Sequence, residues 1–169
     1  RDLHKKGDAL TNVVIMGMGE PFHNYDATME AVDRLTDPAG FNFGARRFTV
    51  STVGLVPMIE RFAAERRQVN LAVSLHAATD DLRSELLPIN KKYPLNVLMA
   101  ACREYVDKTG RRITFEWALI LDRNDKPQHA HALARLLTQP KLTCHVNIIP
   151  LNPTRDYAGA GTTRERADA

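Results

Sequence analysis

Apolar and polar residues are arranged along this chain in two alternating patterns. Short uninterrupted apolar runs predict β-strands at residues 12–16, 48–52, 71–76, 113–121 and 144–149. A run of this length that ends in glycine or polar residues is typical of a strand in a parallel sheet. We expect the first of these runs to be buried on both faces, as in the interior of an α/β protein.

Between these runs, apolar residues recur every three or four positions, which is the period of an amphipathic helix. Helices are expected from about residue 24 to 35, from residue 54 onward, and over residues 80–87, 95–108 and 125–137. Strands that alternate with helices form repeated βα units, and right-handed crossovers place their strands in a parallel sheet. The pattern therefore predicts an α/β fold.

Two architectures satisfy this pattern, a doubly wound sheet and an arc of a (βα) barrel. A complete eight-stranded barrel typically needs ~250 residues, whereas this chain has 169. We predict a partial (βα) barrel of about five parallel strands with outer helices over residues 1–153. Residues 154–169 are rich in Gly, Ala, Thr and Arg, and we expect them to form a flexible C-terminal tail.

Polar side chains at the predicted strand ends favour the arc over the doubly wound sheet. They are Glu20, Ser51, Ser74, His76 and Asn152. Because the C-terminal ends of parallel strands meet at one mouth of a barrel, and ligands bind there, these residues are expected to face a common site. Gly17 and Gly19 precede Glu20 and would let a ligand approach the backbone closely.

Length and composition narrow the class of protein. With 44% hydrophobic residues the chain can bury the core of one globular domain. No apolar stretch approaches the length of a membrane span and no signal peptide is visible, so no membrane partner is expected. Cys102 and Cys144 form no CxxC pair, which favours a reducing, cytoplasmic setting. The chain begins with Arg1, and we expect it to be a piece of a longer protein.

The placement of basic residues is more informative than the net charge of +3. Most basic doublets, such as Arg46-Arg47 and Arg111-Arg112, directly precede a predicted strand and would lie away from the ligand-binding ends. Only Lys91 and Lys92 follow a strand, by way of a long connection. This pair is therefore the best candidate for contact with a polyanion, although two solvated surface lysines would look the same.

Six segments together resemble the radical S-adenosylmethionine family that methylates adenine in RNA, in particular the adenine C2 methyltransferase of large-subunit ribosomal RNA and transfer RNA. The segments are Val14-Ile-Met-Gly-Met-Gly-Glu-Pro21, Val50-Ser-Thr-Val-Gly54, Leu71-Ala-Val-Ser-Leu-His-Ala77, Leu87-Pro-Ile-Asn-Lys-Lys-Tyr-Pro-Leu95, Thr114-Phe-Glu-Trp117 and Val146-Asn-Ile-Ile-Pro-Leu-Asn-Pro153. They occur in the order of the family and cover roughly residues 12–153. The resemblance implies a barrel of the radical S-adenosylmethionine type.

The resemblance also implies a set of contacts to S-adenosylmethionine. Gly19 and Glu20 match positions that hold the methionyl end of this cofactor, and Asn152 matches a position near its adenine. The implied cofactor-binding residues are Gly19, Glu20, Ser51, Ser74, Leu75, His76 and Asn152. Each has a structural alternative, because Glu20 and Asn152 also suit turns, and Ser51, Ser74 and His76 could bond within the fold.

In the family, a 4Fe-4S cluster bound by a CxxxCxxC motif reduces the cofactor to a 5′-deoxyadenosyl radical, and a methyl-carrying cysteine alkylates the base. Neither element is present here, because Cys102 falls on a helix core face and Cys144 begins a strand. We therefore assign no catalytic or metal-binding residue in this chain, place the cluster ligands outside it, and expect the isolated chain to be inactive. The implied partners are ribosomal RNA, transfer RNA as a second substrate, and a cellular electron donor.

Three alternatives remain open on the sequence. A C8-methylating relative shares most of the six segments, so they do not fix which carbon is methylated. A non-catalytic nucleotide- or RNA-binding module would also lack the cluster cysteines. An unrelated βα-barrel enzyme acting on phosphorylated sugars would need a glycine-rich phosphate loop late in the chain, and Gly159 and Gly161 alone do not supply one. Within the leading hypothesis, Lys91 and Lys92 would contact RNA phosphates.

Overall fold

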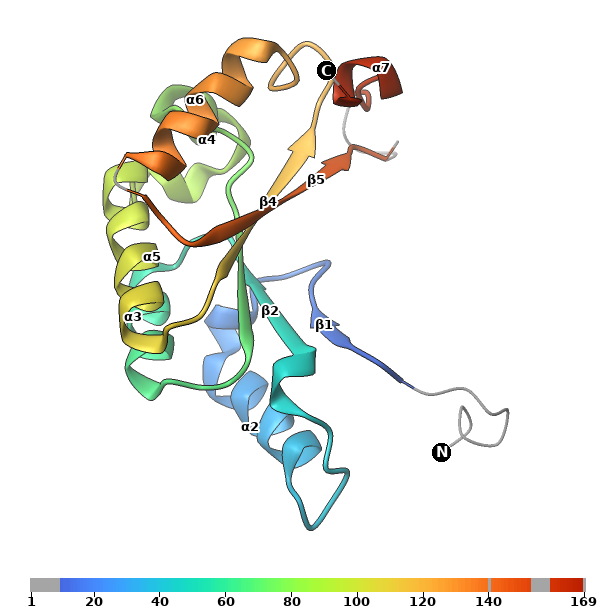
Figure 1. The fold of residues 1–169 in the computed structure, drawn as a ribbon, viewed down its shortest axis with the longest axis vertical. Coiled ribbons are helices and arrows are strands. Elements are labelled where there is room, and N and C mark those ends of the chain that lie inside the picture. The colour runs from blue at the N-terminus through green and yellow to red at the C-terminus, as the bar shows by residue number, and fades with distance from the viewer. Residues whose placement is uncertain (1–9, 140, 153–158, 169) are drawn as a thin grey trace.

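A computed structural model describes residues 10–139, 141–152 and 159–168. They form one sheet of five strands in the order β1-β2-β3-β4-β5, and each strand is parallel to its neighbours (Figure 1). The strands are β1 (Val13–Ile15), β2 (Phe48–Thr52), β3 (Asn70–Ser74), β4 (Ile113–Leu119) and β5 (Cys144–Pro150). The predicted strands and their parallel, sequential order are confirmed.

Helices connect the strands. The α-helices are α2 (Tyr25–Thr36), α3 (Val56–Glu65), α4 (Asp80–Leu86), α5 (Leu95–Thr109), α6 (Pro127–Thr138) and α7 (Arg164–Asp168). Short 3-10 helices are η1 (Pro21–Asn24), η2 (Ala45–Arg47) and η3 (Pro88–Lys91). Among the described residues, no helix is both long and apolar enough to cross a membrane.

Among the described residues, the helices between the strands from β2 to β5 lie on one face of the sheet. In Figure 1, helices α3 to α6 lie on the left of the strands, and the opposite face, which we call the open face, is not covered by them. A doubly wound sheet has helices on both faces, so one-sided coverage identifies an arc of a (βα) barrel. The predicted fold class is therefore confirmed.

Strand alternation gives the two faces different chemistry. Val50, Val73 and Phe115 point toward the helices and are completely buried. The intervening residues point to the open face, and most of them are polar. They are Thr49, Ser51, Asn70, Ser74, Thr114, Glu116, His145 and Asn147. The sheet thus presents a polar inner surface on an apolar core.

The expectation that the first strand is buried on both faces was wrong. Val13 and Ile15 pack on the core, but Val14 is 61% exposed and Met16, just after the strand, is 43% exposed. β1 is one of the two edge strands, and its alternate side chains project from the open face, where no described element covers them. An apolar run shows that a strand can be buried, but not which neighbours are present to bury it.

A cluster of aromatic side chains packs η1 and α2 against α3 and the core. Phe22 lies 5.4 Å from Tyr25 and 5.8 Å from Phe62 between ring centroids. Phe62 on α3 also stacks on Tyr105 of α5 at 6.0 Å. Replacing a buried phenylalanine by alanine costs about 3–5 kcal/mol, so Phe62 is a principal contributor to stability.

Part of the predicted C-terminal tail contacts the body of the fold. Leu121 N–H donates to the Ala160 carbonyl at 2.9 Å, and the Thr162 hydroxyl donates to Asp125 Oδ2 at 2.7 Å. Arg166 forms an ion pair with Asp125 at 3.2 Å. Residues 153–158 lie outside the described residues, so the domain boundary at 153 and the flexibility of the tail stay predictions.

Candidate functional site

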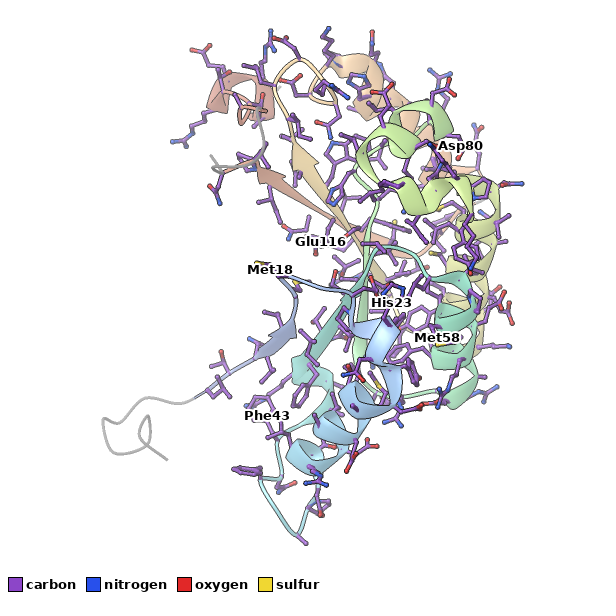
Figure 2. All side chains as sticks on the ribbon, turned by 180° about the vertical axis from the view of Figure 1, so that it is seen from behind. Met18, His23, Phe43, Met58, Asp80 and Glu116 are labelled. Carbon is purple, nitrogen blue, oxygen red and sulfur yellow. The ribbon has the colours of Figure 1, made fainter. Side chains whose placement is uncertain are left out.

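The turn after β1 requires its glycines. Gly17 and Gly19 have φ of +116° and +91°, a region in which side chains other than hydrogen are strained, although there is space for a Cβ at both positions. Met18 between them is fully exposed and lies at the tip of this turn in Figure 2. The turn places Glu20 at the side of the sheet where the strands have their C-terminal ends, which we call the C-terminal edge; the opposite side is the N-terminal edge.

Glu20 binds two loops at once. Its Oε1 accepts a hydrogen bond from Phe22 N–H at 2.9 Å, and its Oε2 accepts one from Val53 N–H at 2.7 Å. The carboxylate therefore ties the turn after β1 to the loop after β2. Each carboxylate oxygen can accept a further bond, so a ligand ammonium or hydroxyl could still bind Glu20.

Ser51 and Ser74 lie on the open face of β2 and β3. Both are half-buried, and within the described part of the chain neither hydroxyl has a hydrogen-bond partner. These hydroxyls are available to a ligand. Leu75 differs, because its side chain is completely buried and its N–H donates to the Glu116 carbonyl at 3.0 Å. Only the backbone of Leu75 could contact a cofactor.

His76 adopts a left-handed backbone with φ of +57°. Its Nδ1 accepts a hydrogen bond from Ala118 N–H at 2.9 Å, which assigns the proton of the neutral ring to Nε2. Burial, and secondarily the positive charge of Arg83, lower the pKa of His76 to about 4. His76 is therefore neutral at pH 7, with Nε2–H as a hydrogen-bond donor.

His76 lines a cavity of about 450 Å³ at the C-terminal edge. An ion pair between Arg123 and Glu85 at 2.7 Å forms part of its wall. The other lining residues are Leu86, Ala118, Ile120 and Leu151. The wall thus combines apolar side chains with His76 and a charged pair, a mixture that occurs in ligand-binding sites.

Two further residues shape this edge and were missed by sequence reasoning. Asn124 is buried and donates through Nδ2 to the carbonyls of His76 at 2.8 Å and Ala118 at 2.7 Å. Its Oδ1 accepts from Ile120 N–H at 2.7 Å. No local sequence signal identifies Asn124 as a residue that holds the His76 backbone, because the two residues are 48 positions apart in the sequence.

Glu116 is the second missed residue. It is only 8% exposed, and its Oε2 accepts a hydrogen bond from Asn147 Nδ2 at 2.8 Å (Figure 2 labels Glu116 on the sheet). No described residue bonds its Oε1. Strand register places Ser74, Glu116 and Asn147 side by side across three strands. Its position in the Thr114–Trp117 segment and the alternation of β4 were signals that could have identified it.

The other residues predicted to contact the cofactor or RNA also lie toward the C-terminal edge of the sheet. Asn152 is exposed two residues after β5 and has no hydrogen bond among the described residues. Lys91 and Lys92 are exposed, and Lys92 Nζ lies 5.3 Å from the centre of the Tyr93 ring. They precede α5, which leads back to the start of β4, so they lie toward the C-terminal edge in the helical layer.

The described residues offer no metal site. Among them, no group of three His, Cys, Asp or Glu side chains could hold a metal ion. Burial raises the pKa of the Cys102 thiol to about 12, and it also raises the pKa of Cys144. Iron–sulfur clusters bind thiolates grouped together, so these two cysteines do not fit such a cluster.

Comparison with known proteins places this geometry in a family. No family model matches the chain. It is 56% identical over 158 residues to the probable dual-specificity RNA methyltransferase RlmN 2 of Opitutus terrae, covering 94% of this chain and 36% of that protein. It is 53% identical over all 169 residues to the dual-specificity RNA methyltransferase RlmN 1 of Myxococcus xanthus, covering 46% of that protein. The chain belongs to the dual-specificity RNA methyltransferase family.

Solved structures agree with this family assignment. A radical SAM methyltransferase from Sphaerobacter thermophilus is 56% identical, with a TM-score of 0.94 over 99% of this chain and 48% of that one. A domain of a pyruvate-formate lyase-activating enzyme from Bacteroides vulgatus has a TM-score of 0.65 at 17% identity, which supports the fold alone. The chain thus spans less than half the length of the methyltransferases that it matches.

Proposed function

We propose that this chain is part of a radical S-adenosylmethionine enzyme that methylates C2 of an adenine in ribosomal RNA, with transfer RNA as a second substrate. The names of the relatives support RNA methylation, and the choice of carbon and of RNA is our inference. The single observation that carries the proposal is that polar groups follow the ends of successive parallel strands at one edge of the sheet. Among the described residues, the hydroxyls of Ser51 and Ser74 and the Nε2–H of His76 have no partner, and the Glu20 carboxylate, which accepts two backbone hydrogen bonds, can accept more.

This edge suits the chemistry of S-adenosylmethionine. Adjacent strands lie ~4.8 Å apart, so the distance from β1 to β5 is roughly 19 Å along the sheet, enough for an extended nucleoside–amino-acid conjugate. We propose that Gly19 and Glu20 hold the methionyl end, and that Asn152 lies near the adenine. In between, Ser51, the run Ser74–His76 and the Nε2–H of His76 would meet the hydroxyl and carboxylate groups of the cofactor.

The 4Fe-4S cluster does not fit the described residues, and we propose that its ligands lie outside this chain. When bound, the cluster and S-adenosylmethionine supply the radical chemistry and the methyl group. The residues of this chain bind and orient the cofactor. We further propose Lys91 and Lys92 as RNA phosphate contacts, a cellular electron donor for the cluster, and a cytoplasmic location, which the two unpaired thiols support.

A chimera tests the proposal. These 169 residues would replace the matching part of the Myxococcus xanthus relative, which aligns with the whole chain. We expect the anaerobically reconstituted chimera to methylate a ribosomal RNA fragment, with 2-methyladenosine detected by mass spectrometry of its nucleosides. The isolated chain, treated in the same way, is expected to be inactive and serves as the control.

The other outcomes of this assay are informative. An 8-methyladenosine product would assign the chain to the C8-methylating relatives instead. A chimera that folds, holds its cluster and binds S-adenosylmethionine but methylates no RNA would contradict the proposed enzyme. That result would support a nucleotide-binding module.

A further inference from the structure

Arg83 on α4 is completely buried in the fold. Within the described residues it has no carboxylate at ion-pair distance. Burying a guanidinium without a counter-ion is costly unless its donors are hydrogen-bonded. Burial accordingly lowers the pKa of Arg83 to about 10. The hydrogen bonds of Arg83 must therefore offset a large desolvation cost.

The guanidinium joins three separate segments. Its Nη2 donates to the carbonyls of Val53 at 2.8 Å and of Ser74 at 3.1 Å. Its Nη1 donates to Asn90 Oδ1 at 2.9 Å. The amide of Asn90 donates in turn to Asp80 Oδ1 at 2.9 Å, so the anchor itself is held in place. Arg83 therefore spans the ends of β2 and β3 from one fixed point.

The Val53 peptide is bound from both sides. Its N–H donates to Glu20 Oε2 at 2.7 Å, while its carbonyl accepts from Arg83. Gly54, the next residue, leaves room for this contact, because a Cβ there would lie 3.3 Å from Arg83 Nη2 and 3.1 Å from Leu98 Cδ1. The ends of β1, β2 and β3 are thus linked through Glu20, one peptide and Arg83.

We propose that Arg83 is a positioning residue of the cofactor site, which fixes the separation of the β2 and β3 ends and with it the placement of Ser51, Ser74 and His76. This inference rests on the proposed function, because it assumes that these three residues meet the cofactor. The planar guanidinium suits the task, since one fork reaches two carbonyls and an amide, whereas a lysine ammonium is a point donor. Its charge also favours neutral His76.

The test compares Arg83→Met and Arg83→Lys with Arg34→Met as a matched control. Arg34 is exposed and pairs only with Glu30, at 2.6 Å, among the described residues. S-adenosylmethionine is titrated into each folded chain by calorimetry. We expect Kd to rise at least ~10-fold for Arg83→Met and about 3-fold for Arg83→Lys, as expected for losing some or all of three buried hydrogen bonds. Arg34→Met should match the wild type.

A second readout separates positioning from mere stability. In 15N-labelled chains, the amides of Gly54 and Leu75, which follow the two bound carbonyls, should shift in Arg83→Met and stay unchanged in Arg34→Met. The pKa of His76, followed by its ring proton resonances, should rise in Arg83→Met and be retained in Arg83→Lys. A general loss of stability would produce neither pattern in the folded protein.

Each result decides between positioning and stability. Wild-type affinity in folded Arg83→Met, or in Arg83→Lys if the methionine variant does not fold, would overturn the proposal. If the wild-type chain does not bind S-adenosylmethionine, the proposed cofactor site fails in this chain, and the amide and His76 measurements still test Arg83. Unchanged Gly54 and Leu75 amides would then contradict its positioning role.

Discussion

An asparagine side chain is hydrogen-bonded to the backbone at the N-terminal edge of the sheet and another at the C-terminal edge, but their surroundings differ. At the N-terminal edge, Asn70 Nδ2 donates to the carbonyls of Arg46 at 2.8 Å and Phe48 at 3.0 Å, and its Oδ1 accepts from Arg111. At the C-terminal edge, Asn124 also makes three such bonds. Asn70 is half-buried, whereas Asn124 is almost completely buried.

The two edges also differ in the groups that surround these bonds. At the N-terminal edge, charges neutralise one another at the surface, as in the pair of Arg67 and Asp33 at 2.6 Å. At the C-terminal edge, buried side chains fix the backbone, while the hydroxyls of Ser51 and Ser74 and the Nε2–H of His76 have no hydrogen-bond partner among the described residues. A rigid frame with unpartnered groups is the arrangement expected of a binding site.

The largest expected effect is on the free energy of unfolding. Asn124→Ala leaves an amide N–H and two carbonyls without partners in the interior, and we expect a loss of about 4 kcal/mol. Asn70→Ala removes as many bonds where water can replace them, and we expect a loss of about 1 kcal/mol. Urea unfolding of both variants measures the contrast, and equal losses would contradict the difference that we draw between the edges.

His76 should make stability depend on pH. Because its folded pKa of about 4 lies below the usual value of 6.5, the unfolded chain takes up the proton first as pH falls. The stabilisation is present above pH 6.5 and is lost toward pH 4, by roughly 3 kcal/mol.

His76→Asn is the matched variant for this prediction. An asparagine oxygen can replace Nδ1 as acceptor for Ala118 N–H, and asparagine tolerates the left-handed backbone. Its stability between pH 7 and pH 4.5 should fall less than that of the wild type in denaturant unfolding. Parallel curves for the two chains would show that His76 does not titrate in the folded state as proposed.

Glu20 and Thr52 both hold the loop after β2, but only Glu20 is proposed to meet the cofactor. Thr52 Oγ1 accepts from Gly54 N–H at 3.1 Å on the buried side of the sheet. Glu20→Gln should weaken S-adenosylmethionine binding by about 2 kcal/mol through loss of a charge-assisted contact. Thr52→Val should lower stability but not affinity. Calorimetry compares them, and equal affinities for wild type and Glu20→Gln would leave Glu20 with a structural role alone.

The smallest expected effect concerns RNA. In the chimera, replacing Lys91 and Lys92 with glutamine should reduce the slope of log K against log salt by about 1.4–1.8. The comparison is the same change at Arg66 and Arg67, which lie at the N-terminal edge just before β3. A reduced slope in the arginine variant, with no change in the lysine variant, would move the RNA to the opposite edge of the sheet.

Local sequence patterns were sufficient to predict the strands and helices of this fold. Apolar runs and helical periods located the strands and helices, and polar strand ends distinguished an arc of a barrel from a doubly wound sheet. The exposure of Val14 was not predictable, because it depends on what lies beside β1 in space. Periodicity is a property of one segment, whereas burial depends on the elements that pack beside that segment.

The resemblance to a family supplied the site residues, but it did not reveal how they are held. Glu20 looked like a turn residue or a ligand contact, and its bond to Val53 crosses 33 positions of sequence. Arg83 stands in a short polar helix where an exposed side chain would be expected, yet it is buried. Such long-range bonds between side chains and backbone leave no local signature, so only the folded structure reveals them.

The most direct test of the central claim is to map S-adenosylmethionine binding onto the two edges by nuclear magnetic resonance. With the 15N-labelled chain, we predict that the amides of Val53, His76 and Ala118 at the C-terminal edge shift as the cofactor is added. The amides of Asn70 and Arg111 at the N-terminal edge should stay in place. Shifts confined to the N-terminal edge, or no shifts at saturating cofactor, would contradict a cofactor site at the C-terminal edge of the open face.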